Sequence, residues 1–156
     1  MNKQYLLACK NPSLREDFIK LVTEKFPLNP YARKITYKDK DGGLTVICTK
    51  IPFLYPLIKK KPAIIVVYPL AFDLTFHPQA EDFISTLIYH EGHHAKEIYL
   101  GIRKMIPAMD IEGELEETCE NEIKAIKNQI RNFSGNSEKF IERVKRNLSS
   151  WENLKL

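Results

Sequence analysis

The sequence predicts an α+β fold in which a small mixed sheet of three or four strands packs on helices. Short segments rich in β-branched residues occupy the first half of the chain, whereas long segments with apolar residues at helical spacing fill the second half. The chain has 156 residues, of which 44% are hydrophobic, and this is enough to build one core. We therefore expect residues 1–156 to form a single domain.

An N-terminal helix is predicted over residues 13–26. Ser13 is a residue type favoured as a helix cap, and Phe18 and Val22 belong to an apolar stripe at helical spacing. Pro27 follows and is expected to end the helix. This helix should cover one face of the sheet.

The strands are predicted by alternation and by β-branched residues. Residues 34–38 and 44–50 alternate in polarity on either side of an Asp-Gly-Gly turn, which indicates a β-hairpin. Residues 63–68 form a continuous apolar run, which is typical of a strand buried on both faces. Residues 74–76 are expected to add a short edge strand.

Three helices are predicted after the sheet. The first begins at Pro78, since proline is favoured at the first helical position, and it ends at Gly101. The second covers residues 111–133, where apolar residues recur in steps of four and three. The third covers residues 137–154 and is the segment available to cover a cleft.

The composition argues against several classes of function. The net charge of +4 is spread along the chain, so nucleic-acid binding is not indicated. No secretory signal is apparent, and the longest nearly uncharged stretch, residues 62–72, is shorter than the roughly 20 residues that span a bilayer. We therefore expect a cytoplasmic protein without a membrane partner. The three cysteines lack C-x-x-C spacing, so no thiolate zinc site is expected.

His90, Glu91 and His94 form the pattern H-E-x-x-H within the first of these helices. Histidines at i and i+4 lie one turn apart on the same helix face, where both imidazoles can bind one tetrahedral cation. The carboxylate of Glu91 beside them can take a proton from a water that zinc activates. The pattern predicts a zinc site with His90 and His94 as ligands and Glu91 as the catalytic base.

The third zinc ligand is expected from the acidic helix at residues 111–133, because a catalytic zinc usually keeps three protein ligands and one open position. No histidine follows His94, so this ligand must be acidic. Extending the apolar stripe backward from Cys119 reaches Glu116, which is the predicted ligand. Glu120, one turn later, is predicted to accept a hydrogen bond from a ligand histidine.

Other acidic residues stay open as ligands. Glu112 and Glu122 also lie near the apolar stripe, whereas Glu117 is expected to point towards water. His93 lies around the helix from the ligand face and is expected to support the site or to face solvent. The acidic candidates are Asp110, Glu112, Glu114, Glu116, Glu117, Glu120 and Glu122.

The H-E-x-x-H helix, followed by the run Glu116-Glu117-Thr118-Cys119-Glu120, resembles the gluzincin metallopeptidases, in which a glutamate of the next helix completes the zinc site. The size is similar to that of minimal single-domain gluzincins and of the catalytic core of ImmA/IrrE-type regulators. The resemblance covers about residues 63–127, and Glu120 stands where the motif usually has Asp or Asn.

This resemblance implies a zinc-dependent peptidase that acts on a peptide or protein substrate. The substrate would pair with a sheet edge, for which residues 74–77 are the expected segment. A side chain that stabilises the oxyanion is also implied, and Tyr89, Tyr99 and His77 are open for that role.

A non-catalytic alternative uses the same zinc ligands. In a zinc-stabilised regulatory or protein-binding module, a fourth protein ligand would close the site, and His93 or Glu120 is a candidate for it. The number of protein ligands around the metal therefore separates the two hypotheses.

Overall fold

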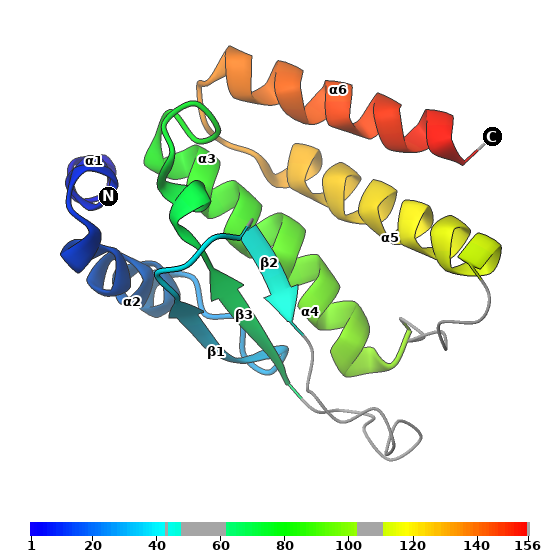
Figure 1. Cartoon of the computed structure of the whole chain (residues 1–156), viewed down its shortest axis with the longest axis horizontal. Helices are drawn as coiled ribbons and strands as arrows, with labels where there is room; N and C mark the ends of the chain where they lie inside the picture. Colours follow the sequence, from blue (N-terminus) through cyan, green and yellow to red (C-terminus); the bar gives the residue numbers. More distant parts are fainter. Residues whose placement is uncertain (43, 48–61, 103–110, 156) are drawn as a thin grey trace.

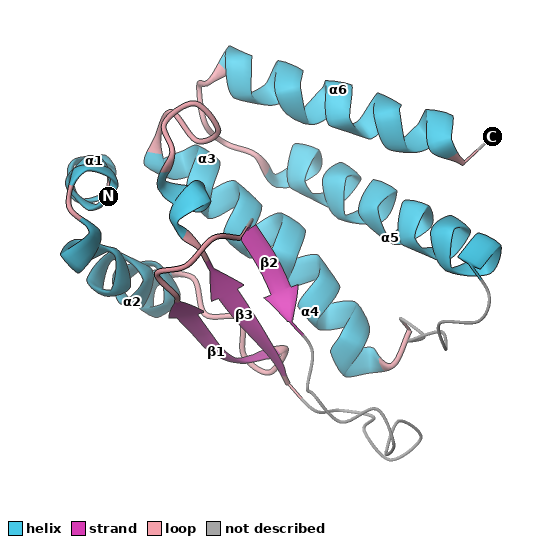
Figure 2. Ribbon diagram, viewed as in Figure 1, coloured by secondary structure: helices cyan, strands magenta, loops and turns pink. Residues whose placement is uncertain are grey.

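The structure, a computed structural model, describes residues 1–42, 44–47, 62–102 and 111–155, and for 44–47 and 111–115 it describes the backbone alone. Helices make up most of the described residues (Figure 2). The helical elements are α1 (Asn2–Lys10), η1 (Pro12–Leu14), α2 (Arg15–Lys25), η3 (Pro69–Phe72), α3 (Ala80–Ile84), η4 (Ser85–His90), α4 (Glu91–Leu100), α5 (Ile111–Asn132) and α6 (Glu138–Leu154). The strands are β1 (Ala32–Tyr37), β2 (Leu44–Ile47) and β3 (Ala63–Val67).

β3 is the central strand of the sheet. β1 pairs with one side of it in parallel, and β2 pairs with the other side antiparallel. Every residue of β3 is buried except Ile64, which is half-buried. The continuous apolar run of this strand is therefore buried, as predicted, and it occupies the position with a neighbour on each side.

The predicted fold class was wrong in its balance of helix and sheet, because the described chain is mainly helical. The hairpin was also wrong: β1 and β2 lie on opposite sides of β3, since the most apolar strand takes the central place. Residues 74–76 form a turn instead of an edge strand. There the Asp73 side chain accepts a hydrogen bond from the Thr75 N–H at 2.8 Å, a turn-forming contact that competes with strand pairing.

The predicted N-terminal helix corresponds to α2, and a separate helix that was not predicted, α1, precedes it. Tyr5 and Ala8 of α1 are fully buried, and the Tyr5 hydroxyl donates to the carbonyl of His77 at 2.9 Å. Asn11, instead of Ser13, caps the next turn by accepting a hydrogen bond from the Ser13 N–H at 3.2 Å. The spacing of Tyr5 and Ala8 was the signal for α1 in the sequence.

A single long helix, built from α3, η4 and α4, lies between the sheet and α5 (Figure 1). Its N-terminus is a capping box of Gln79 and Asp82, one residue after the predicted start. Its end at Gly101 was predicted correctly, and this residue has the left-handed φ of 67° that glycine tolerates best. The middle part, η4, is π-helical, which the sequence did not predict.

α5 packs along this long helix, and α6 packs on the outer side of α5, so the helices form successive layers on the sheet (Figure 1). Both α5 and α6 match their predicted ranges within two residues. Ile126, Phe140 and Val144 form a separate buried cluster between them. None of the described helices combines the length and the apolar character needed to cross a membrane.

Candidate metal centre

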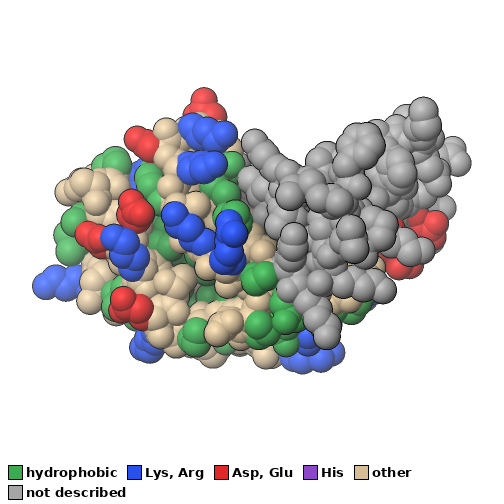
Figure 3. All heavy atoms as spheres, turned by 90° about the horizontal axis from the view of Figure 1, so that it is seen from below, with side chains coloured by type: hydrophobic (Ala, Val, Ile, Leu, Met, Phe, Trp, Pro, Cys, Tyr) green, Lys and Arg blue, Asp and Glu red, His purple; other side chains and the backbone are tan. Residues whose placement is uncertain are grey.

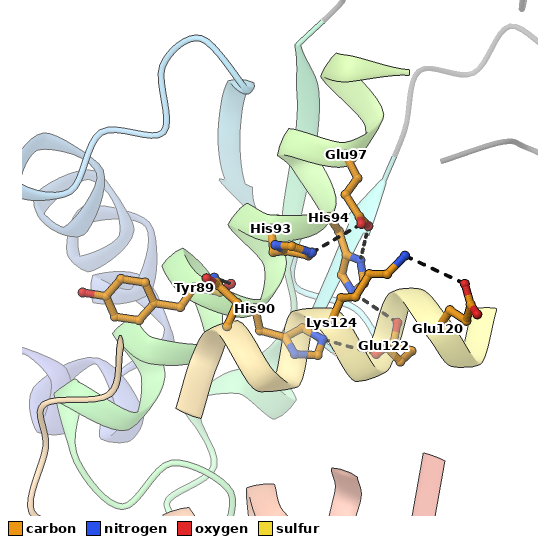
Figure 4. Close-up of polar contacts among 9 residues, drawn as sticks. Tyr89, His90, His93, His94, Glu97, Glu120, Glu122 and Lys124 are labelled. Carbon is orange, nitrogen blue, oxygen red and sulfur yellow. Dashed lines mark hydrogen bonds and ion pairs between the residues drawn. The ribbon is translucent and has the colours of Figure 1, made fainter. Parts of the chain in front are cut away.

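His90 and His94 lie together on the face of the long helix that is turned towards α5 (Figure 4). His90 ends the π-helical segment η4, and His94 follows one α-helical turn later in α4. Their ring centroids are 5.0 Å apart, and only 3% of His94 is exposed. The predicted pair is therefore one turn apart, as binding of a common ion requires, with His94 buried and His90 half-buried.

Glu122 of α5 places one carboxylate oxygen on each histidine. Its Oε2 lies 3.3 Å from Nε2 of His90, and its Oε1 lies 3.1 Å from Nε2 of His94 (Figure 4). One ligand atom of each residue lies within 4.8 Å of those of the other two. This group of three is the one cluster in the described part of the chain that can hold a metal ion.

The contact lengths at this group can be compared with the ligand spacing of a metal site. Zinc binds imidazole nitrogen at about 2.0 to 2.1 Å, so neighbouring ligand atoms of a tetrahedral site lie roughly 3.3 to 3.4 Å apart. Glu122 lies 3.3 Å from His90 through Oε2 and 3.1 Å from His94 through Oε1, so each contact comes close to this separation through a different carboxylate oxygen. Two imidazoles and one carboxylate are also a ligand set that zinc uses in catalytic sites.

The charges of the three groups depend on one another. Burial alone raises the pKa of Glu122, but the hydrogen bonds and charges of His90 and His94 outweigh it and hold this pKa far below its usual range. Burial lowers the pKa of His90, and the hydrogen bond that it donates to Glu122, together with the charges of Glu91 and Glu122, reverses this to a net rise. The carboxylate of Glu122 is therefore held in its charged form.

The structure brings Glu122, and not the predicted Glu116, to the histidines. Both glutamates lie three residues from the buried Cys119, about 60° from it on opposite sides of the helix, so the apolar stripe alone does not separate them. They differ by about 9 Å along the helix axis. Glu116 is exposed and belongs to no metal-binding group in the described residues.

Two hydrogen bonds set which turn of α5 faces the histidines. Asn128 Nδ2 donates to the carbonyl of Tyr89 at 2.7 Å, and Gln129 Nε2 donates to Oγ1 of Thr86 at 2.9 Å. α5 runs antiparallel to the long helix, so a residue nearer the start of α5 faces a later turn of α4 (Figure 1). Glu122 falls opposite the histidines in this register, and Glu116 falls near the end of α4.

The other acidic candidates lie elsewhere. Glu120, predicted to bond a ligand histidine, instead accepts a hydrogen bond from Nζ of Lys155 at 2.6 Å and lies 3.9 Å from Nζ of Lys124 (Figure 4). Glu117 is half-buried. Asp110 and the side chains of Glu112 and Glu114 lie outside the described residues.

The carboxylate nearest to the far nitrogen of His94 among the described contacts belongs to Glu97, which the sequence analysis missed. Its Oε2 lies 3.9 Å from Nδ1 of His94 and its Oε1 lies 3.3 Å from Nε2 of His93, and it is only 5% exposed. Since Nε2 of His94 faces Glu122, Nδ1 is the nitrogen left for an acceptor. The signal in the sequence was a glutamate three residues after the second histidine, on the same helix face.

Glu91 lies beside the ligands at the wall of a cavity of about 640 Å³. It is 6% exposed, and both Glu91 and His90 line this cavity. The opposite wall is α6, which contributes side chains from Phe140 to Ser150. The last helix therefore forms part of the cleft, and one candidate ligand, His90, and the predicted base face a space of the size that binds small ligands or short peptide segments.

The three candidates for oxyanion stabilisation occupy different surroundings. Tyr89 points away from the ligands (Figure 4), and Tyr99 packs against Tyr31 with ring centroids 5.6 Å apart. His77 lines the cavity, but its Nδ1 lies 3.1 Å from the carbonyl of Ala71 and its Nε2 lies 3.1 Å from Oγ1 of Thr86. Both nitrogens of His77 therefore have partners within the chain.

Comparison of this chain with models of protein families, with curated proteins and with solved structures finds no match. The resemblance to gluzincins therefore depends on the H-E-x-x-H pattern and on the geometry of His90, His94 and Glu122 alone.

Proposed function

We propose that the protein is a zinc-dependent metallopeptidase that hydrolyses peptide bonds, with Glu91 as the general base. One observation carries this proposal: His90, His94 and Glu122 meet beside the cavity that Glu91 lines. Three protein ligands leave one coordination position of a tetrahedral ion for water or substrate, as in catalytic zinc sites. The proposed metal site would be of the gluzincin type, with Glu122 as its glutamate ligand.

Each residue of the site would have a separate task. His90, His94 and Glu122 would hold the ion, which when bound supplies an acidified water and polarises the substrate carbonyl. The carboxylate of Glu91 would accept the proton of the attacking water and deliver it to the leaving amine. Because Glu91 is buried at the edge of the cavity, substrate would exclude water from it further on binding.

The substrate would be an extended peptide. In the described part of the chain, β2 pairs with β3 alone, so its outer side offers backbone donors and acceptors to an added strand. This replaces residues 74–77 as the proposed edge, since those residues form a turn.

The non-catalytic alternative requires a fourth protein ligand. His93 faces Glu97 and Glu120 faces Lys155, so neither side chain proposed for that position is directed at the ligand group. Nucleic-acid binding has little support, because basic side chains lie among acidic and apolar ones on the described part of the face in Figure 3. The peptidase is therefore the better-supported function.

Metal analysis combined with the Glu91→Gln variant tests the proposal. The wild-type protein should bind one zinc ion and cleave an unstructured protein such as denatured casein. The variant should keep the zinc and lose about 100- to 10,000-fold of the cleavage rate, the usual contribution of a general base. Glu116→Gln, at an exposed position of α5, is the matched control and should behave as wild type. Equal hydrolysis by Glu91→Gln and wild type would refute the function.

A further inference from the structure

The cavity beside the metal centre has one wall with two positive charges. Arg143 and Arg146, both on α6, line this cavity, and among the described residues Glu91 is the one acidic residue that lines it. His77 adds no charge at neutral pH, because burial lowers its pKa to about 4. The wall of α6 therefore carries two positive charges, and the described acidic residue of the cavity, Glu91, belongs to the long helix.

The two arginines differ in how firmly they are held. Arg143 Nη1 donates to the carbonyl of Thr75 at 2.8 Å, its Nη2 donates to the carbonyl of Phe76, and the guanidinium lies over the rings of Phe76 and Phe140 at 5.4 and 5.2 Å. Arg146 is exposed, and within the described chain no ion pair engages its guanidinium. Arg143 is thus fixed in the wall, whereas Arg146 is able to bind a ligand.

The charge of the whole site is unbalanced once an ion is bound. A divalent cation would be neutralised by the carboxylates of Glu122 and Glu91, and the charge of Asp82 acts on Arg143, which leaves the guanidinium of Arg146 without an acidic partner among the described residues. Burial lowers the pKa of Arg143, and the neighbouring charge of Arg146 adds to this fall, while Asp82 opposes it. An anionic group in the cavity would relieve this repulsion between like charges.

One part of the cavity rim is apolar. Leu70 and Phe76 line the cavity and are 44% and 41% exposed, and the ring of Phe76 lies against the guanidinium of Arg143. A peptide lying in the cavity would therefore place apolar parts against this rim and a charged part against α6.

We propose that the cavity selects peptides that carry an aspartate or glutamate close to the scissile bond, and that Arg146 is the residue that pairs with this carboxylate. The proposal rests on the peptidase function, because it assigns the substrate class of the same site. Arg146 is a specificity-determining residue here, and the chemistry stays with Glu91 and the metal ligands.

The test compares two peptides that differ only by glutamate or glutamine at one position next to the cleaved bond, scanned over the positions on both sides. With zinc-loaded wild-type protein at low salt, kcat/KM for the best glutamate peptide should exceed that of its glutamine partner by about 5-fold, the magnitude of one partly exposed ion pair. Salt should reduce this ratio. Arg146→Gln should bring the ratio close to one, and Arg146→Glu should invert it.

Lys145→Gln is the matched control, because Lys145 is an exposed cation of the same helix that does not line the cavity. It should keep the wild-type ratio. Two results would overturn the proposed preference for acidic peptides without touching the peptidase function. One is a glutamate-to-glutamine ratio of kcat/KM near one at every position in the wild-type protein. The other is an Arg146→Gln variant that cleaves peptides with the wild-type ratio. Failure to cleave any peptide in either set would instead overturn the peptidase function and the preference with it.

Discussion

Nε2 of His94 lies 3.1 Å from Oε1 of Glu122, although the two residues belong to different helices that are separated along the chain. The contact exists because α5 runs antiparallel to the long helix and is held in register by hydrogen bonds from Asn128 and Gln129. Glu116, six residues earlier, lies about 120° around the helix from Glu122 and about 9 Å away along its axis, so it does not meet the histidines. The packing of α5 on the long helix therefore decides which glutamate lies beside His90 and His94.

Replacing Glu122 should weaken metal binding much more than replacing Glu116. Glu122→Gln keeps the shape of the side chain but removes its charge, and we expect zinc affinity to fall by at least about 100-fold, more than the loss of a supporting residue usually costs. Glu116→Gln should leave the affinity unchanged within error. Competition with a chromophoric chelator measures both constants, and similar losses in the two variants would contradict the assignment of Glu122.

Zinc should stabilise the folded protein, because the three ligand residues are brought together only by folding. At a free zinc concentration of 100 times Kd, the stabilisation should be about 2.7 kcal/mol, which raises Tm by roughly 5 to 10 °C for a domain of this size. Removal of zinc with a chelator should reverse the shift. His94→Ala should show no such shift, and an equal rise of Tm in that variant would place the metal elsewhere.

Glu97→Gln tests whether the buried carboxylate orients His94. The carboxylate lies 3.9 Å from Nδ1 of His94, on the side of the ring away from Glu122. Its loss should lower zinc affinity by about 10-fold, as the loss of residues that orient ligand histidines commonly does. It should also change the ratio of the two His94 tautomers in nitrogen-detected NMR, which a general loss of stability would not do.

Glu120→Gln is the control for Glu97→Gln. Glu120 was the residue predicted to support a histidine, but it lies in an exposed ion pair with Lys155. Its replacement should leave zinc affinity unchanged, because exposed ion pairs contribute little and this one does not touch the ligands. If Glu120→Gln lowered zinc affinity as much as Glu97→Gln, the orienting role of Glu97 would be rejected.

The sequence was sufficient for the features that repeat locally. The long helix, α5 and α6 follow from helical periodicity, and the histidine pair with Glu91 follows from their spacing within one helix. The central place of β3 follows from its uninterrupted apolar run. Each of these depends on residues close together in the chain, where sequence and structure are directly connected.

Features that depend on contacts between distant segments were not predictable in the same way. The choice between Glu116 and Glu122 depends on how far α5 slides along the long helix, and side-chain amides of Asn128 and Gln129 set that position. The predicted hairpin is absent because β1 and β2 each pair with β3 instead of with each other. The predicted edge strand at residues 74–76 is absent because the Asp73 side chain stabilises a turn there.

His77 should make the stability of the protein depend on pH. Burial, together with the charge of Arg143, lowers the pKa of His77 to about 4, whereas an unfolded histidine has a pKa of about 6.5. The unfolded state therefore binds more protons between pH 4 and 6.5, so the contribution of His77 is fully present above pH 6.5 and is lost as the pH falls towards 4. The loss should reach up to about 3 kcal/mol in zinc-free protein.

His77→Asn removes this titration while keeping a donor near the position of Nδ1. Its free energy of unfolding, measured by denaturant titration, should be lower than that of wild type at pH 7.5, and the difference should shrink as the pH is lowered to 4. Gln129→Ala provides the control, because it breaks the hydrogen bond to Thr86 next to His77 without removing a titratable group. It should cost about 1 to 3 kcal/mol at every pH, since it leaves a buried polar group without its partner. A constant difference between His77→Asn and wild type from pH 7.5 to 4 would show that His77 is not the group whose protonation opposes folding.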